Sequence, residues 1–249
     1  TPRTSSAASD VYKRQFDNGK FINKSKSLLP IYYRDKLFFT RDSGENPGVN
    51  VDLSARCGLE CSRCQRQTYY DNSKEIPGHD LTIEDFMKIT DMFKTINFCG
   101  QLSDPVHNKY FIDILRLCKT KNVGGTIHNA SSLKSKEWYI EAFKAHPDMR
   151  WIFGIDGLPK DSCMYRVNQD GEKLFDIMLE SKKYLKTIPV WQYIIFSYNE
   201  NDIDEAKQIA KDNGVKFNLN YSSKWFTEDD PLRPKNKDLS IWSNQYNEV

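Results

Sequence analysis

The 249-residue sequence lacks several features that would narrow its class at once. It has no run of about 18 apolar residues, and its longest apolar stretches, such as residues 194 to 196, are as short as a strand. No membrane-spanning helix is therefore predicted, and we expect a soluble cytoplasmic protein. It also lacks an excess of one charge, with 36 Lys and Arg against 34 Asp and Glu. This balance does not favour a nucleic-acid partner, although it does not exclude one.

Cysteine is present, but not in the pattern of a disulfide framework. Three of the six cysteines, Cys99, Cys118 and Cys163, lie far apart in segments that we interpret as core. A chain of this length with 39% hydrophobic residues can bury a core without covalent cross-links. We therefore expect these three to be reduced, packed thiols in a reducing compartment.

The two ends of the chain differ in composition from the rest. Residues 1 to 15 begin without Met and show no apolar periodicity. We interpret them as a sequencing or assembly artefact of the kind found in environmental sequences, and exclude them from fold prediction. Residues 16 to 48 are expected to form a lead-in strand or hairpin. Residues 222 to 249 are polar and contain proline, and we expect an irregular C-terminal segment that could be truncated.

Residues 49 to 221 alternate between short apolar strands and helical stretches. The expected strands begin at residues 49, 96, 125, 151, 190 and 216. One expected helix is opened by Thr82 with Asp85 three residues on, which is a variant of the capping box. The other expected helices are residues 109 to 119, 135 to 145, 171 to 186 and 202 to 211. This alternation predicts a parallel sheet wound with right-handed crossovers.

The alternation within each strand indicates the shape of the sheet. Asn218 and Asn220 alternate with apolar residues in the last strand, and Gln192 does so in the strand before it. A doubly wound sheet would be apolar on both faces, whereas a curled sheet around a ligand has one polar face. We therefore favour a partial barrel, and expect Gln192, Asn218 and Asn220 to line its lumen and orient a substrate.

The other three cysteines stand close together in CGLECSRC, residues 57 to 64. A structural zinc site normally needs four protein ligands, and no fourth cysteine lies near Cys57, Cys61 and Cys64. An iron–sulfur cube held by three cysteines has one iron free for an outside ligand, which suits catalysis. The loop also follows the first strand, where the sites of βα folds gather. An incidental cluster, or zinc completed by a distant residue, is the alternative.

This C-x3-C-x2-C spacing, with the βα repeat after it, resembles the motif of the radical S-adenosylmethionine (radical SAM) superfamily. The resemblance implies an α/β fold, a partial (β/α)6 TIM-like barrel, in which Cys57, Cys61 and Cys64 hold a [4Fe–4S] cluster. It implies SAM on the fourth iron, and reductive cleavage of SAM to methionine and a 5′-deoxyadenosyl radical that abstracts a substrate hydrogen. The implied partner is an external electron donor such as flavodoxin or ferredoxin.

Weaker matches extend the resemblance along the chain. FCGQLSDP, from residue 98, is similar to the family's glycine-rich stretch after the second strand, which meets the amino group of SAM. HNASSL at 128 and GIDGL at 154 resemble the sequences at the ends of the family's third and fourth strands. YR at 165 is similar to the family sequence that carries a basic residue after the fourth strand. The resemblance thus implies SAM-binding roles for Gly100, Asp104, Asn129, Asp156 and Arg166. An aspartate can accept hydrogen bonds from the ammonium group, and an arginine can pair with the carboxylate.

The sequence also departs from the family pattern. Arg63 stands where an aromatic residue commonly touches adenine, and its guanidinium plane could stack there instead. Many relatives end in a cysteine-rich extension that binds auxiliary clusters, but residues 222 to 249 contain no cysteine.

The substrate is predicted from the same resemblance. GIDGL and YR are most similar to the branch of peptide maturases and the molybdenum-cofactor cyclase, which favours a peptide or protein side chain. Arg56, Arg63 and Arg66 beside the cysteine motif leave a nucleotide or tRNA substrate as an alternative. A non-enzymatic iron–sulfur or zinc-binding regulatory protein is the alternative from another class.

Overall fold

The computed structural model describes residues 16–17, 20–21, 29–33, 36–41, 48–100, 102–222, 225, 227–243 and 247–248, with side chains between residues 48 and 240. The interpretation of residues 1 to 15 falls outside the described residues.

A curved sheet of nine strands in the order β11-β10-β9-β8-β7-β6-β5-β4-β3 forms the centre of the fold. Its six central strands run parallel to one another. They are β5 (Gly48–Val51), β6 (Thr95–Phe98), β7 (Gly124–Asn129), β8 (Arg150–Gly154), β9 (Val190–Ile195) and β10 (Lys216–Tyr221). Each begins within one residue of the position that the sequence predicts.

Antiparallel strands extend the sheet beyond β5. Strand β3 (Leu29–Tyr33) pairs with β4 (Lys36–Arg41), and β4 pairs with β5. The lead-in segment therefore contains the expected hairpin. A separate two-stranded sheet precedes it, formed by β1 (Phe16–Asp17) and β2 (Lys20–Phe21).

The C-terminal segment also contains regular structure, which differs from the irregular segment expected. The 3-10 helix η3 (Lys237–Ser243) follows the loop after β10, and β11 (Asn247–Glu248) pairs antiparallel with β10. Backbone groups on that edge of β10 thus form hydrogen bonds with β11. No local pattern in this polar segment predicts the pairing.

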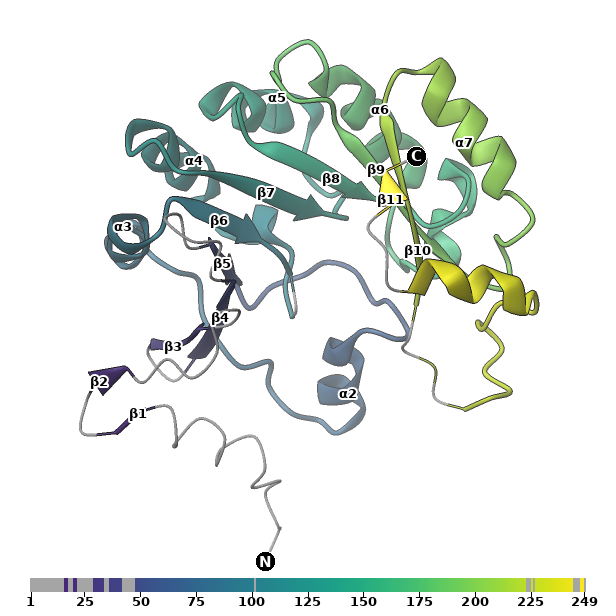
Figure 1. Ribbon diagram of the computed structural model, residues 1–249, viewed down its shortest axis with the longest axis horizontal. Helices are drawn as coiled ribbons and strands as arrows, with labels where there is room; N and C mark the ends of the chain where they lie inside the picture. Colours follow the sequence, from purple (N-terminus) through teal and green to yellow (C-terminus); the bar gives the residue numbers. More distant parts are fainter. Residues whose placement is uncertain are drawn as a thin grey trace, which may run out of the picture.

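Five helices join the parallel strands and lie in an arc on the outer side of the sheet (Figure 1). They are α3 (Ile83–Met92), α4 (Phe111–Thr120), α5 (Lys136–Ala145), α6 (Gly171–Ser181) and α7 (Ile203–Asp212). Thr82 and Asp85 form the expected capping box at the start of α3. Helix α6 ends five residues earlier than expected, where the Ser181 hydroxyl donates to the Met178 carbonyl. Among the described helices, none combines the length and the apolar character needed to cross a membrane.

Shorter helices lie in the loops at the C-terminal ends of the strands. Helix α2 (Gln65–Asp71) follows the cysteine motif and lies on the side of the sheet opposite the arc of α3 to α7 (Figure 1). The 3-10 helices η1 (Pro105–His107) and η2 (Pro159–Met164) follow β6 and β8. None of the three was expected, because each is too short to show a clear periodicity.

The core lies between the sheet and the five outer helices. Residues that the strand pattern assigned to this face are buried there, among them Val51, Trp151, Phe153, Trp191, Tyr193, Phe217 and Leu219. The Trp151 ring meets Phe143 edge-on at 4.8 Å and Phe111 at 6.1 Å, which fixes how α4 and α5 pack on β8. With helices on one face and a polar concave face on the other, the architecture is the expected partial barrel.

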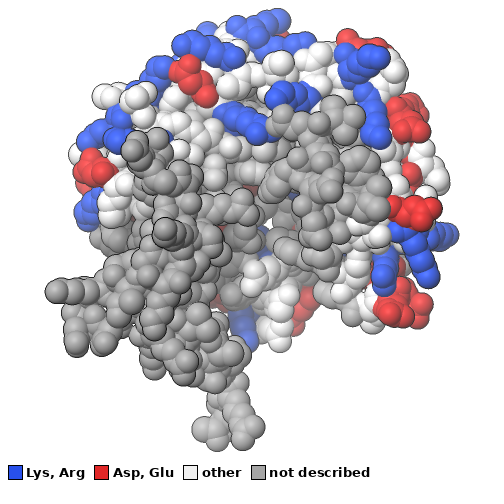
Figure 2. Space-filling model, in the orientation of Figure 1, with Lys and Arg blue, Asp and Glu red and all other residues white. Residues whose placement is uncertain are grey.

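The outer surface carries both signs of charge. On the face shown in Figure 2, Lys and Arg side chains follow the upper rim, with Asp and Glu side chains among them. Elsewhere in the structure, charged side chains join neighbouring βα units, as in the ion pairs Lys121–Asp91, at 2.9 Å, and Lys119–Asp148. Such exposed pairs contribute little to stability. They are compatible with the near-neutral net charge of +2.

Candidate functional site

A cavity of about 980 Å³ opens on the concave side of the sheet and reaches the C-terminal ends of the strands. Its volume lies near the upper end of the range for ligand and cofactor sites. The site residues predicted from the sequence that line it are Cys57, Cys61, Arg63, Cys64, Gly100, Asp104, Asn129, Arg166, Gln192 and Asn218. Two predicted site residues are not part of this lining. Asp156 lies just behind it in contact with Arg166, whereas Asn220 is half-buried elsewhere on β10.

The three clustered cysteines lie on the loop that leads from β5 to α2, which we call the cysteine loop (residues 55 to 64). Cys64 caps α2, and its N–H donates to the Cys61 carbonyl at 2.9 Å, which forms a tight turn between the two. The Glu60 N–H donates to the Val167 carbonyl at 3.1 Å and so attaches the loop to the segment after η2. Cys57, Cys61 and Cys64 form no disulfide.

The chemistry of these thiols fits an iron–sulfur cluster. Burial, with the nearby Asp104 charge, raises the pKa of Cys57 to about 12, and burial raises that of Cys61 to about 11. Both therefore keep their protons until a metal displaces them. Among the described residues, no three His, Cys, Asp or Glu side chains gather around one ion position. In a cube each cysteine binds a different iron, so its three sulfurs need not converge.

Two arginines near the cysteines, Arg56 and Arg66, are bound by other groups of the chain. Arg66 is buried, and donates to the Ala55 carbonyl and the Tyr70 hydroxyl at 2.7 Å each, and to the Leu102 carbonyl. It thereby ties α2 to the loop after β6. Arg56 is more exposed and forms an ion pair with Asp80.

Arg63, between the second and third cysteines, pairs with a residue far along the chain. Its Nε lies 2.9 Å from Asp230 Oδ2 and its Nη2 lies 2.8 Å from Asp230 Oδ1. The side chains are 13% and 1% exposed, so this is a nearly buried bidentate ion pair. The edge of the guanidinium is thus engaged by a carboxylate, and the stacking of its plane on adenine stays a prediction.

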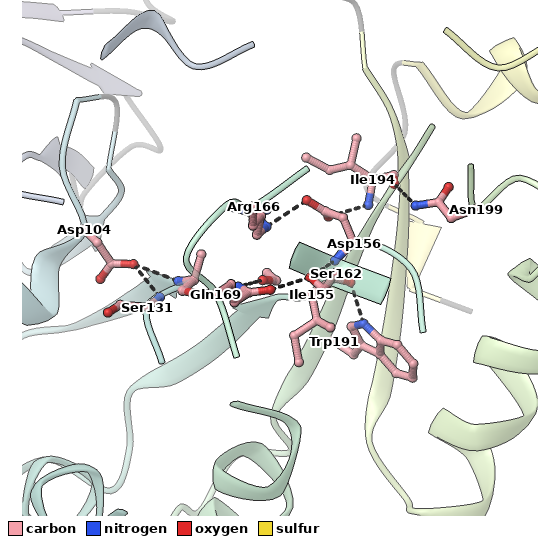
Figure 3. A network of polar contacts seen from close by, with 12 residues as sticks. Asp104, Ser131, Ile155, Asp156, Ser162, Arg166, Gln169, Trp191, Ile194 and Asn199 are labelled. Atoms are coloured by element: carbon pink, nitrogen blue, oxygen red, sulfur yellow. Dashed lines mark hydrogen bonds and ion pairs between the residues drawn. The ribbon is translucent and has the colours of Figure 1, made fainter. Parts of the chain in front are cut away.

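Asp104 organises the loops that follow β6 and β7. Its Oδ2 accepts from the N–H groups of Ala130 and Ser131 at 2.8 and 3.0 Å, and its Oδ1 accepts from Val106 N–H at 3.2 Å. Figure 3 shows the two contacts of Oδ2. Asp104 is 4% exposed, and this burial raises its pKa to about 6 although the three N–H donors oppose the rise. A carboxylate has about four acceptor positions, so one remains for a ligand.

The neighbouring predicted residues also shape these strand ends. Asn129 ends β7, and its Oδ1 accepts from Ser131 N–H at 3.1 Å and from the Tyr139 hydroxyl at 3.2 Å. Gly100 follows β6, and a Cβ there would lie 1.5 Å from the Ser103 carbonyl oxygen. Only glycine allows this approach of the two backbones, which brings the turn into the cavity wall.

An ion pair lies at the end of β8. Arg166 Nε is 2.7 Å from Asp156 Oδ2, and the two side chains are 12% and 0% exposed. Asp156 Oδ1 also accepts from Ile194 N–H at 2.8 Å, which links β8 to β9. Gly154 makes room for the guanidinium, because a Cβ there would lie 2.7 Å from Arg166 Nη2. Figure 3 shows this pair and Asp104 in one view of the polar network at the strand ends.

Two residues in the middle of this network were missed by the sequence analysis. Gln169 donates from Nε2 to the carbonyls of Ala130, at 2.6 Å, and Gly154, at 2.9 Å. Its Oε1 accepts from the Ser162 hydroxyl, whose oxygen accepts from Asp156 N–H at 2.9 Å. Gln169 therefore bridges the ends of β7 and β8 (Figure 3). Neither residue belongs to a motif, so no signal in the sequence could have identified it.

Polar side chains continue down the inner face of the strands. Direct neighbours across β5 to β8 line the cavity in one row, formed by Asn50, Asn97, Thr126 and Arg150. Farther along the sheet, Gln192 and Asn218 are paired neighbours on β9 and β10. Asn218 is 1% exposed, and its Oδ1 has no hydrogen-bond partner among the described residues. Because an unpaired buried acceptor costs about 1–3 kcal/mol, this oxygen calls for a ligand or a water molecule.

The three isolated cysteines have different surroundings. Cys118 is buried in the core, as expected, whereas Cys163 is exposed, contrary to the expectation of a packed thiol. Cys99 differs from the expectation of a packed thiol, because it follows β6 and lines the cavity next to Gly100.

Comparisons with known proteins find similarity in structure alone. No protein-family model matches the chain, and no curated protein matches its sequence. Streptococcus suis SuiB bound to the precursor peptide SuiA matches with a TM-score of 0.61 and 12% identity, over 78% of this chain and 44% of that one. Methylornithine synthase (PylB) matches with a TM-score of 0.55 and 14% identity, over 76% of this chain and 58% of that one.

A radical SAM methyltransferase from Sphaerobacter thermophilus matches with a TM-score of 0.54 and 12% identity, over 96% of this chain and 77% of that one. The chain thus spans about half the length of SuiB and PylB, at 44% and 58%, and more of the methyltransferase. Identities this low show the fold, and the chain has the partial-barrel fold of the radical SAM enzymes.

Proposed function

We propose that this chain is a radical SAM enzyme, with a [4Fe–4S] cluster on Cys57, Cys61 and Cys64. The observation that carries the proposal is a shared cavity: these cysteines line the same space as the predicted SAM residues and the polar lumen. When bound, the reduced cluster supplies an electron that cleaves SAM to methionine and a 5′-deoxyadenosyl radical, which takes a hydrogen atom from the substrate. A purely regulatory metal protein would need the cysteines, but not this cavity.

The chain's own residues would bind and orient SAM at the strand ends. Asp104 has an acceptor position left for the ammonium group of SAM. Arg166 lines the cavity while Asp156 offsets part of its charge from behind, so the guanidinium is positioned for a carboxylate. Gly100 and Asn129 shape the backbone around these two groups.

For the substrate we favour a peptide or protein side chain. The GIDGL and YR patterns support it, as does the fold likeness to SuiB, which was solved with a precursor peptide. The amides of Gln192 and Asn218 also offer donors and acceptors of the kind that pair with a peptide backbone. The tRNA or nucleotide alternative rested on Arg56, Arg63 and Arg66, and each of these already binds groups of this chain. Flavodoxin or ferredoxin remains the proposed electron donor.

The proposal is tested by the metal content of protein reconstituted with iron and sulfide under anaerobic conditions. We expect about four irons per chain and the spectrum of a [4Fe–4S] cluster. Cys57→Ala, Cys61→Ala and Cys64→Ala should each lose the cluster, because each removes one of its thiolates. Cys163→Ala, at the exposed cysteine, is the matched control and should keep it. Tightly bound zinc with no iron after reconstitution would contradict the proposal.

A further inference from the structure

The ion pair of Arg63 and Asp230 joins the cysteine loop to a segment 167 residues away. Arg63 lies between two of the proposed cluster ligands, and its side chain donates to both oxygens of one carboxylate. With Asp230 almost fully buried, neither charge is well solvated once the partner is lost. The positions of the two segments are therefore coupled through this pair.

Asp230 belongs to a short segment that the chain holds firmly, which we call the C-terminal strap (residues 227 to 233). Within the strap, Leu232 N–H donates to Asp230 Oδ1 at 3.0 Å, so the carboxylate is oriented before it meets Arg63. The strap is also attached to the loop after β9. Ser197 N–H donates to the Leu232 carbonyl at 3.0 Å, and the Ser197 hydroxyl donates to the Pro231 carbonyl at 2.6 Å.

Apolar contacts place the strap beside the cysteines. Leu232, with Trp225 just before the strap, packs against a small buried cluster that includes residues of the cysteine loop. The buried members of that cluster are Leu59, Cys61, Tyr165 and Phe196. The Tyr165 and Phe196 rings lie 4.2 Å apart, and Trp225 meets Phe196 edge-on at 5.9 Å. The strap thus contacts the cysteine loop both through apolar groups and through the ion pair.

We propose that Arg63 and Asp230 are a positioning pair, which locks the C-terminal strap onto the cysteine loop and limits solvent access to the cluster. Exposure to solvent is one of the factors that set the reduction potential of such clusters. The part of this inference that concerns the cluster rests on the proposed function. The coupling between loop and strap does not, because it is a property of the protein without any cofactor.

Hydrogen exchange of the cofactor-free protein tests the coupling. Asp230→Asn removes the charge but keeps an acceptor for Leu232 N–H, and Arg63→Met removes the other partner. Each should speed amide exchange about tenfold in both the strap and residues 57 to 64, and the double variant should exchange no faster than the faster single variant. Glu141→Gln breaks the exposed ion pair with Arg116 and should change neither segment. Faster exchange confined to the strap, or additive effects of the two substitutions, would overturn the inference.

The reconstituted protein gives a second test, based on the properties of the cluster. A pair that served the fold alone would leave these properties unchanged. In Asp230→Asn and Arg63→Met the cluster absorption should bleach in air about tenfold faster than in the unsubstituted protein and Glu141→Gln, and the midpoint potential should shift. If the unsubstituted protein binds no cluster, the proposed function fails while the exchange experiment still decides the coupling. If the unsubstituted protein binds a cluster, and the clusters of the variants bleach at the same rate and have the same midpoint potential as its cluster, this inference fails while the proposed function stands.

Discussion

Asp104→Ala is expected to destabilise the protein strongly, even before SAM is considered. The substitution leaves the N–H groups of Val106 and Ala130 without their acceptor, while Ser131 N–H keeps only Asn129 Oδ1. Each unsatisfied buried donor costs about 1–3 kcal/mol, and with partial relaxation the loss should be about 3–5 kcal/mol. That is a large part of the stability of about 5–15 kcal/mol that is typical of a domain. Asp104→Asn keeps one oxygen for the Ala130 and Ser131 donors and should cost about 1–3 kcal/mol.

The same carboxyl predicts a pH dependence of stability without ligand. Burial raises its folded-state pKa to about 6 from the ordinary 3.8, so between these pH values the folded chain holds more protons than the unfolded one. The contribution of this carboxyl to stability should therefore be largest below about pH 4 and fall by about 3 kcal/mol as the pH rises through about 6. Urea unfolding at several pH values should show this fall, and Asp104→Asn should lack it. An equal fall in the Asn variant would refute the burial argument.

SAM binding then separates the structural role of Asp104 from its proposed role as a ligand. With the fold retained, Asp104→Asn should weaken SAM binding about ten- to hundredfold, as expected for the loss of a charge-assisted hydrogen bond, and leave the iron content unchanged. Asp113→Asn, on an exposed residue of α4, is the control. Titration calorimetry measures both variants. Unchanged affinity in Asp104→Asn would mean that another group accepts the ammonium of SAM.

Two further predictions concern the lumen and the strand ends. Asn218→Ala removes a buried acceptor that has no partner among the described residues, so the free energy of unfolding of the cofactor-free protein in urea should stay unchanged or rise. Gln169→Ala leaves the carbonyls of Ala130 and Gly154 without their donor, so it should lower this free energy by about 1–3 kcal/mol. A drop as large for Asn218→Ala as for Gln169→Ala would contradict the assignment of that oxygen to a ligand. Gly154→Ala should displace Arg166 and weaken SAM binding with the cluster retained, because its Cβ would lie 2.7 Å from Nη2; unchanged SAM affinity would argue against a carboxylate role for Arg166.

The parts of the fold that could be predicted are those that produce a periodic pattern of apolar residues within one short segment. The parallel strands begin where the apolar runs predict, and alternation correctly placed Trp191 in the core and Gln192 in the cavity wall. The same rule predicted an inward position for Asn220, which does not line the cavity. Asn220 is the second-last residue of β10, and its direct neighbour Ile194 on β9 does line the cavity, so the lining does not extend from β9 to β10 at this position.

The rest of the site depends on contacts between distant segments, which leave no local pattern. Asp230 lies in a polar stretch that was expected to be irregular, yet it pairs with Arg63 beside the cysteines. Gln169 joins two strand ends through hydrogen bonds to backbone carbonyls, which any sequence at those positions would offer. The three clustered cysteines, by contrast, form a pattern within one short stretch, so the sequence alone could predict a candidate cluster site there.

The central claim is tested most directly by the fate of SAM on the reduced protein. Reconstituted protein and Cys61→Ala should be incubated anaerobically with SAM and dithionite, and 5′-deoxyadenosine and methionine measured by mass spectrometry. The account predicts that the unsubstituted protein forms both products in equal amounts and that Cys61→Ala forms neither. Absence of 5′-deoxyadenosine from protein shown to carry a reduced [4Fe–4S] cluster, or equal formation by Cys61→Ala, would contradict it.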